Sequence, residues 1–172
     1  MALSDKIVQT GLSYVGQQEI SGNKGLKNAA FQKKMEECGW SMTQSWCAYF
    51  AELVWKEAFG KSHPLWKTLD RLFSPSATAT FANFKGHPTE FATGKTPKMG
   101  ALVVWQYGNG CQGHIGVVTE LVDKTTFKTV EGNTNSSGGR EGTEVASKTR
   151  KLGEAFKAKG LNIVGFVYPP EA

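Results

Sequence analysis

The sequence has few cysteines and no long apolar run, and both shortages limit what the chain can be. Its three cysteines, an odd number, make neither a disulfide framework nor a paired zinc signature, so at least one thiol is free. The longest apolar stretch, around Trp46 to Trp55, contains Glu52 and falls far short of the ~18 residues that a membrane helix needs. Insertion into a membrane is therefore not expected.

A disorder-promoting composition is lacking as well. Only six prolines occur among 172 residues, and 40% hydrophobic residues is an ordinary share for a globular protein. A chain of this length supplies one substantial core but hardly a second. We therefore expect residues 1–172 to form a single domain that carries one site.

Positive charge is in excess, with a net charge of +5 and a pI near 9.1. This balance suits a protein that meets a polyanion, and a cell wall, a nucleic acid and an anionic lipid all qualify. The basic residues are scattered, apart from a cluster of Lys148, Arg150 and Lys151, and no nucleic-acid motif occurs. The cluster is predicted to be solvated surface, and no nucleic-acid partner is predicted.

The first half of the chain has helical periodicity. A first helix is predicted with Ser4 as its N-cap, and a second is predicted to begin near Asn28 and to stop at Gly39. The segment QSWCAYFAELVWKEAFG, with Ser45 as N-cap and Gly60 as stop, is apolar almost all the way round. It is predicted to be the central buried helix.

The second half has the alternation and the turn residues of β-strands. Before it, between residues 61 and 94, prolines divide the chain into short helical pieces, one of them predicted from Ser76 to Phe84. From Gly100 onward five segments are predicted as strands: ALVVWQ, HIGVVTEL, TFKTVEG, TEVASKT and NIVGFVYP. Their short connections favour antiparallel pairing. The prediction is an α+β fold in which N-terminal helices pack, through the central helix, on a C-terminal antiparallel sheet.

Cys47 stands at the beginning of the predicted central helix. Unpaired amides and the helix dipole stabilise negative charge there, so this position favours a nucleophilic thiolate. Taken by itself, the position fits a packed core thiol equally well. Cys38, just before Gly39, is interpreted as a small buried residue, and Cys111, in the loop YGNGCQG, is left without a role.

His114 lies at the start of a predicted strand, among glycines that leave room for a partner. A hairpin joins this strand to the one that ends in VEGNTN. A turn centred on residues 122 and 123 puts His114 opposite Glu131, and a turn centred on 123 and 124 puts it opposite Asn133. These two residues are two apart and project from the same face. Either can accept a hydrogen bond from one imidazole nitrogen and leave the other nitrogen for the thiol.

Seen alone, Glu131 fits an exposed turn carboxylate and Asn133 fits a turn former. Together with Cys47 and His114 they form the arrangement that nucleophilic acyl transfer requires. A thiolate attacks a carbonyl, a proton passes to the leaving amine, and water hydrolyses the thioester. The residues therefore predict a cysteine-dependent amide hydrolase.

Several segments resemble, in order and spacing, the landmarks of a known family. SWCAYFAELVW, PKMGALVVWQ, GHIGVVTE, VEGNTN and the closing GFVYP are similar to those of the CHAP domain, the cysteine and histidine-dependent amidohydrolases/peptidases of the papain-like superfamily. The resemblance extends from about Trp40 to Pro169. It implies a papain-like fold with Cys47 as nucleophile, His114 as base and Glu131 as the group that orients His114, with Asn133 as a further polar member of the site.

The resemblance also implies a substrate. Family members mostly cut peptidoglycan, either between N-acetylmuramic acid and L-alanine or within the stem and cross-bridge peptides. No cofactor is implied. Some phage members carry a calcium site built from aspartates just before the nucleophile, but CGWSMTQSW contains none, so no metal requirement is predicted. The acidic residue that usually follows the glycine of the first strand is Ala101 here, which is expected to affect a supporting contact.

Three further residues are candidates for binding substrate. Gln44 is predicted to add a side-chain amide to the Cys47 amide as an oxyanion donor, although a simple loop glutamine fits as well. Trp46 and Trp105 are predicted to line a groove for sugar and peptide, although most aromatic residues at such positions belong to the core.

The preferred hypothesis is a peptidoglycan hydrolase, and two alternatives stay open: an acyl or peptidyl transferase or non-wall amidase with the same site, and a non-catalytic binding protein. The start, MALSDKIVQTGLSYVG, lacks the pattern of a signal peptide. Synthesis in the cytoplasm is therefore expected, with action in the periplasm or cell wall after release as a phage lysin or delivery as an antibacterial effector. Besides peptidoglycan, a delivery machine and an immunity or inhibitor protein are the expected partners.

Overall fold

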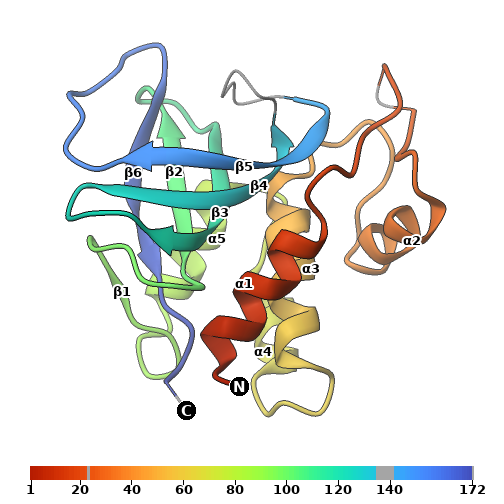
Figure 1. The fold of residues 1–172 in the computed structure, drawn as a ribbon, viewed down its shortest axis with the longest axis horizontal. Coiled ribbons are helices and arrows are strands. Elements are labelled where there is room, and N and C mark those ends of the chain that lie inside the picture. Colours follow the sequence, from red (N-terminus) through yellow and green to blue (C-terminus); the bar gives the residue numbers. More distant parts are fainter. Residues whose placement is uncertain (23, 135–141, 172) are drawn as a thin grey trace.

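The computed structural model describes residues 1–22, 24–134 and 142–171, which form five helices followed by a six-stranded antiparallel sheet (Figure 1). The sheet order is β1-β6-β2-β3-β4-β5. This confirms the predicted α+β fold. The helices are α1 Leu3–Ser13, α2 Ala29–Glu37, α3 Cys47–Phe59, α4 Trp66–Leu72 and α5 Ala77–Lys85; the strands are β1 Thr93–Gly94, β2 Leu102–Tyr107, β3 Gly113–Leu121, β4 Thr126–Thr134, β5 Glu144–Lys151 and β6 Leu161–Val167.

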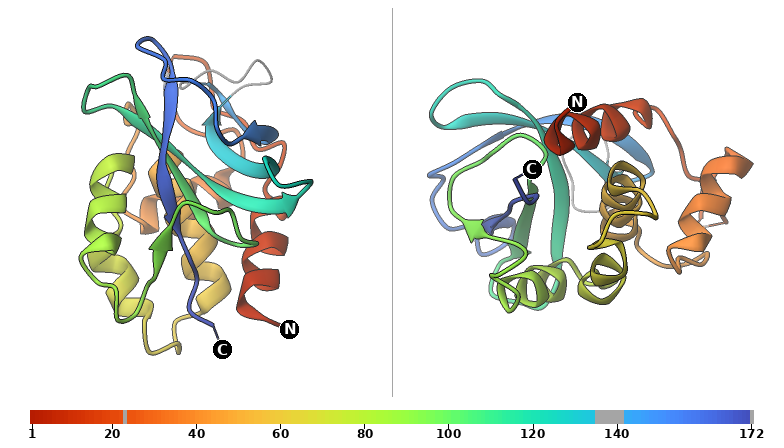
Figure 2. Two further views of the ribbon diagram at one scale, coloured as in Figure 1. Left: turned by 90° about the vertical axis from the view of Figure 1, so that its left-hand side faces the viewer. Right: turned by 90° about the horizontal axis from the view of Figure 1, so that it is seen from below.

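Helix α3 lies at the centre of the molecule, as its continuous apolar sequence predicts. Every residue of α3 except Glu57 is buried, and the helix ends at Gly60, whose φ of 79° favours glycine. It packs against α1 and against strands β3 and β4, while α2 lies on its outer side, away from the sheet (Figures 1 and 2). The helix that begins with Cys47 therefore rests on the sheet that carries His114.

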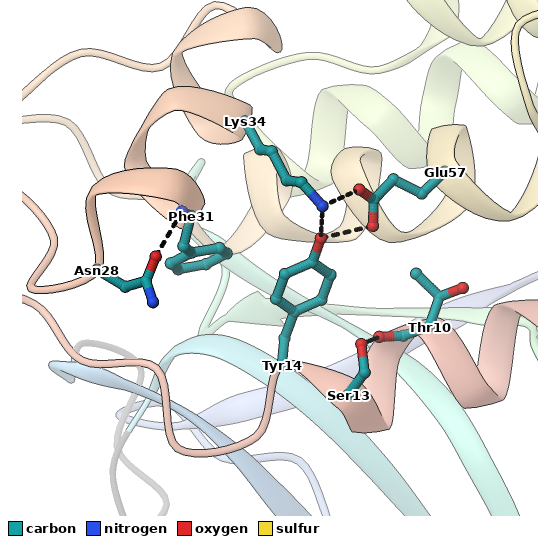
Figure 3. Close-up of polar contacts among 7 residues, drawn as sticks. All are labelled: Thr10, Ser13, Tyr14, Asn28, Phe31, Lys34 and Glu57. Atoms are coloured by element: carbon teal, nitrogen blue, oxygen red, sulfur yellow. Dashed lines mark hydrogen bonds and ion pairs between the residues drawn. The ribbon is translucent and has the colours of Figure 1, made fainter.

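The peripheral helix α2 is held to this core by a polar cluster (Figure 3). Asn28 caps α2, since its side chain accepts a hydrogen bond from the Phe31 N–H at 2.9 Å. The Lys34 ammonium donates to the hydroxyl of Tyr14 at 2.9 Å and to the carboxylate of Glu57 at 2.6 Å, and Tyr14 donates to Glu57 at 2.5 Å. The end of α1, the middle of α2 and the exposed side of α3 are thus joined, which fixes the start of the loop that leads to Cys47.

Some local predictions differ from the structure. Helix α1 begins at Leu3, with Ala2 in the N-cap position and no side-chain cap, so Ser4 lies inside the first turn and the predicted Ser4 cap is wrong. Ser76 does cap α5, by accepting a hydrogen bond from the Ala79 N–H. Helix α4 and the two-residue strand β1 lie in the proline-interrupted region and were not predicted as separate elements.

The two faces of the sheet carry separate apolar layers because side chains alternate along each strand. On β3, Ile115 and Val117 belong to the layer that packs on the helices. Val118 belongs to the other layer, together with Trp105 of β2 and Phe127 of β4. In the described part of the chain, no helix has the length and apolar character needed to cross a membrane.

Candidate active site

Cys47 is the first residue of α3, and its side chain is buried. The residue in the N-cap position is Trp46, which offers no side-chain cap, so the predicted Ser45 cap is wrong. The first hydrogen bond of the helix runs from the Phe50 N–H to the Trp46 carbonyl at 2.9 Å. The amides of residues 47–49 therefore precede the intrahelical ladder, and they are available to an anion at the thiol.

The loop before Cys47 is fixed by Trp40 and Gln44. The Trp40 indole N–H donates to the main-chain carbonyl of Gln44 at 3.0 Å. The side-chain oxygen of Gln44 accepts from the Ser41 N–H at 3.0 Å and from the Tyr49 hydroxyl at 3.3 Å. The oxygen of Gln44 thus holds the loop to the first turn of α3. An oxyanion role for its side-chain N–H groups stays a prediction.

A close approach between α3 and β4 sets the depth of the thiol. A Cβ at Gly132 would lie 2.6 Å from the Cβ of Phe50, so only glycine allows the first turn of α3 to rest on the strand. Phe50 is one turn beyond Cys47. Gly132 therefore allows the start of α3 to lie against β4, the strand that carries Glu131.

His114 and Glu131 form a buried pair. The Nε2 atom of His114 lies 2.7 Å from Oε1 of Glu131, and neither side chain is exposed. Burial alone lowers the pKa of His114, but its contacts with the Cys47 thiol and the Glu131 carboxylate outweigh that and raise the pKa to about 9. Because Nε2 is hydrogen-bonded to Glu131, Nδ1 is the nitrogen left for the thiol. The Nδ1 atom has no hydrogen-bond partner among the described residues.

The pairing of β3 with β4 follows one of the two predicted registers. On the side near the site, Val117 pairs with Val130 and Val118 with Thr129, which corresponds to a turn centred on residues 123 and 124. A bulge between Val118 and Glu120 shifts the pairs nearer the turn by one residue. Continued toward the site, this register puts His114 opposite Asn133, whereas the hydrogen bond of the imidazole goes to Glu131. The carboxylate reaches His114 diagonally, across the position of Gly116.

Gly116 provides the room for that diagonal reach. A Cβ at Gly116 would lie 2.7 Å from Cγ of Glu131. We expect Gly116→Ala to displace the carboxylate and to lower the free energy of unfolding by about 1–3 kcal/mol, because a well-packed site does not accept an added methyl group. Urea unfolding measures the loss, and the downfield proton signal of His114 Nε2–H reports the broken pair.

The matched control is Gly110→Ala, because the nearest atom to a Cβ there is the Tyr107 carbonyl oxygen at 3.6 Å. That variant is expected to keep both the stability and the His114 signal of the wild type. A Gly116→Ala protein with the wild-type Nε2–H signal would show that glycine is not needed for the pair.

Arg150 and Thr129 complete the surroundings of Glu131, and the sequence interpretation missed both. Arg150 donates from Nε to Oε2 at 2.8 Å and from Nη2 to Oε1 at 2.5 Å, and the Thr129 hydroxyl donates to Oε2 at 2.5 Å. Burial raises the pKa of Glu131, but the hydrogen bonds and charges of Arg150 and His114 prevail and lower it to about 2. The carboxylate is therefore ionised at neutral pH.

The predicted solvated cluster of Lys148, Arg150 and Lys151 is only partly solvated. Lys151 is exposed, but Arg150 turns inward to Glu131, and the ammonium of Lys148 is buried without a hydrogen-bond partner among the described residues. Burial lowers the pKa of Lys148. Alternation along β5 puts Lys148 and Arg150 on one face, and that spacing is the signal that could have separated them from Lys151.

The two tryptophans predicted for the substrate groove are core residues. Trp46 is fully buried against Phe31, with ring centroids 6.2 Å apart. Trp105 is 3% exposed and lies 5.7 Å from the His114 ring, with the planes 31° apart. Trp105 thus supports the histidine from the side, and neither indole offers a surface to a substrate.

Asn133 lies at the border of a polar cavity of about 350 Å³ beside the start of α3. Its φ of 52° is left-handed, a conformation that asparagine tolerates better than most residues. The cavity is also lined by Thr43 and Ser45 of the loop before Cys47. Asn133 thus borders this cavity together with that loop, whereas the His114 ring bonds to Glu131.

The other cysteines lie outside this group. Cys38 is half-buried, and burial raises the pKa of its thiol to about 12, whereas Cys111 is exposed. Within residues 1–22, 24–134 and 142–171 no group of three His, Cys, Asp or Glu side chains is arranged to hold a metal ion. The structure thus brings together Cys47, His114 and Glu131, with unpaired helix amides at the thiol. That arrangement can carry a thiolate attack and a proton transfer.

Comparison with known proteins adds one finding. The sequence model of a family described as CHAP domain matches residues 39–133, more than half of the chain. The match contains Cys47, His114, Glu131 and Asn133, while Arg150 lies beyond its end. No curated protein matches the chain.

Proposed function

Since the chain belongs to the CHAP domain family, we propose that it is a peptidoglycan hydrolase that cleaves an amide bond with Cys47 as nucleophile. The family is one of amidohydrolases and peptidases. The observation that carries the proposal is the buried His114–Glu131 pair, at 2.7 Å, next to a cysteine at a helix start. The bond cut is either that between N-acetylmuramic acid and L-alanine or one within the stem or cross-bridge peptides.

The first half of the reaction forms a thioester. The Cys47 proton passes to Nδ1 of His114, while Nε2–H stays bonded to the ionised Glu131. The thiolate attacks the carbonyl carbon, and the oxyanion that forms accepts hydrogen bonds from the unpaired amides at the start of α3. The imidazolium then donates its proton to the leaving amine as the carbon–nitrogen bond breaks.

The second half releases the product. A water molecule enters where the amine left, His114 takes its proton, and the hydroxide adds to the thioester carbonyl. Collapse of this intermediate expels the thiolate and frees the carboxylic acid. Glu131 stays ionised throughout and holds the ring in one orientation, so it positions the base without exchanging a proton. Asn133, Ser45 and Thr43 border the polar cavity through which the peptide is proposed to run.

The protein is proposed to act on the wall after release from a cell or delivery into one. Its net charge of +5 supports a hold on an anionic wall. A delivery machine and an immunity or inhibitor protein are proposed partners in the effector setting, in which the protein would be antibacterial.

The test is digestion of purified peptidoglycan of several chemotypes, with the soluble products identified by mass spectrometry. A parallel sample is treated with iodoacetamide in a Cys38→Ser/Cys111→Ser background, so that Cys47 is the thiol that reacts. New muropeptides or free stem peptides from the untreated sample alone support the proposal and name the bond. Products that incorporate added amine acceptors indicate a transferase. Absence of muropeptide release from every chemotype contradicts the hydrolase proposal.

The raised pKa of His114, about 9, predicts the basic limb of the pH profile. The imidazolium that protonates the leaving amine loses its proton as the pH passes this value, so kcat/KM is expected to stay high at pH 7–8 and to fall above about pH 9. Initial rates of muropeptide release between pH 5 and 10 measure this. A fall centred near pH 6.5, the ordinary pKa of histidine, would contradict a pKa of His114 that is raised by its contacts with Cys47 and Glu131.

A further inference from the structure

Arg150 closes a ring of contacts behind the proposed base. Its guanidinium donates to both oxygens of Glu131, and its carbon Cζ lies 4.8 Å from the centroid of the Trp105 ring. Trp105 in turn lies beside His114, with centroids 5.7 Å apart. One side chain on β5 therefore contacts two of the groups that touch the imidazole, the carboxylate at its edge and the indole at its side.

The contact with Glu131 fixes the orientation of the carboxylate. Oε1 accepts from His114 and from Nη2 of Arg150, while Oε2 accepts from Thr129 and from Nε of Arg150. A planar guanidinium that binds both oxygens of a carboxylate defines the plane of that carboxylate, which a single ammonium does not do. With Arg150 in place, rotation of Glu131 away from Nε2 would break three further hydrogen bonds, two from Arg150 and one from Thr129.

The contact of Arg150 with Trp105 restrains the imidazole of His114 from a second side. A guanidinium over an indole face is attracted to it, and the Arg150 side chain is only 17% exposed, so water competes weakly. Trp105 contacts both Arg150 and His114, and an indole packed beside the imidazole limits the rotation of that ring. The orientation of Nδ1 toward the thiol therefore depends on β5, a strand that lies beyond the residues matched by the family model.

We propose that Arg150 is a positioning residue for the reaction: through Glu131 and Trp105 it holds His114 with Nε2 bonded and Nδ1 directed to Cys47. This rests on the proposed function only for its turnover measurements, because the state of the Cys47–His114 pair is also measurable by alkylation of the thiol.

Among the described residues, four charged or titratable groups, His114 itself included, lie around the Glu131 carboxylate and the His114 ring. His114 comes from β3, Cys47 from α3, and Arg150 and Lys148 from β5. Lys148 adds positive charge near Glu131 but makes no hydrogen bond with the described residues, so Arg150 is the cation that binds the carboxylate. Without Arg150, Glu131 should accept a proton at a higher pH, and a protonated Glu131 no longer stabilises the imidazolium that accompanies the thiolate.

The experiment compares Arg150→Met, Arg150→Lys and Lys151→Met in the Cys38→Ser/Cys111→Ser background. Lys151→Met is the matched control, since Lys151 is the neighbouring residue of β5 and is exposed on the other face. Two profiles are recorded between pH 3.5 and 9: the rate at which iodoacetamide alkylates Cys47, and kcat and KM for muropeptide release. Urea unfolding at each pH restricts the comparison to folded protein.

For Arg150→Met we expect the acid limb of both profiles to move up by about 1–3 pH units. We also expect kcat at pH 7 to fall by about 10²-fold, since a small displacement of a catalytic group has an effect of that size, with KM changed by less than about threefold. Arg150→Lys keeps the charge but loses the planar fork, so it should restore the acid limb and recover kcat only in part. Lys151→Met should match its parent in both profiles.

A folded Arg150→Met protein with the parent acid limb and parent kcat would overturn the proposal. Lower stability with unchanged profiles of the folded fraction would also overturn it, because that result describes a purely structural residue. If no variant and no parent protein releases muropeptides but the alkylation limb shifts as expected, the proposal for Arg150 stands and the proposed substrate falls.

Discussion

Cys47→Ala is expected to abolish muropeptide release, lowering kcat by about 10⁶-fold, as loss of the nucleophile does in other acyl-transfer enzymes. The fold should survive. Cys47 begins α3, alanine is the best helix former, and the first hydrogen bond of the helix joins the main chain of Phe50 to that of Trp46. We expect the free energy of unfolding to change by no more than about 1 kcal/mol. Release of soluble muropeptides measures the first effect and urea unfolding the second.

The controls for this variant are the other two thiols. Cys111 is exposed, and Cys38 lies half-buried near the end of α2, so Cys38→Ser and Cys111→Ser should keep the wild-type rate. A Cys47→Ser protein should be nearly as inactive as Cys47→Ala, because a hydroxyl ionises far less readily than a thiol. Equal release by Cys47→Ala and wild type would contradict the role of Cys47 as nucleophile.

Elements with strong local signals could be predicted from the sequence. The apolar run of α3 predicts a helix surrounded by protein, and Asn28 and Gly60 mark helix ends through their own side chain or conformation. The five long strands have alternating residues and turns between them, and all five are present. Ser45 failed as an N-cap because the loop closed by Trp40 and Gln44 starts the helix one residue later.

The candidate site was predictable as far as its residues share a hairpin. His114 and Glu131 are joined by one turn, so their proximity follows from counting along two strands. The choice between Glu131 and Asn133 needed the space above Gly116, which no residue pattern reports. The role of Arg150 was not predicted, because the pairing of β5 with the strand that carries Glu131 could not be counted from the sequence. A row of basic residues also does not reveal which side chains point inward.

Trp46 and Trp105 illustrate the same limit. An aromatic residue beside a nucleophile or a base suits a substrate groove and a core equally in the sequence, and the packing of distant elements decides between them. Trp46 is covered by α2 through Phe31, and Trp105 is covered by Arg150 of β5. Both partners are far away in the chain.

Replacement of Glu131 is expected to damage both stability and activity. Glu131→Leu leaves the guanidinium of Arg150 without its carboxylate partner and removes one of the negative charges near Lys148, which should lower the free energy of unfolding at pH 7 by about 3–5 kcal/mol. Glu131→Gln keeps the shape of the side chain but can present its NH2 group to Nε2 of His114 and favour the wrong tautomer, so it should lower kcat by about 10⁴-fold. Muropeptide release and urea unfolding measure the two effects.

The pH dependence of the stability gap separates the charge of Glu131 from its shape. The folded protein lowers the pKa of Glu131 from its ordinary value of 4.5 to about 2, so the carboxylate stabilises the fold fully above pH 4.5 and loses that contribution as the pH falls toward 2. The gap between wild type and Glu131→Gln should therefore be widest near neutral pH and narrow below pH 4.5. Glu120→Gln is the control: this side chain is 54% exposed and pairs with Lys128 on the surface, so its gap should stay within about 1 kcal/mol at every pH. A Glu131→Gln gap of constant size from pH 7 to pH 3 would mean that the loss comes from the changed hydrogen bonds of the amide, and not from the missing charge.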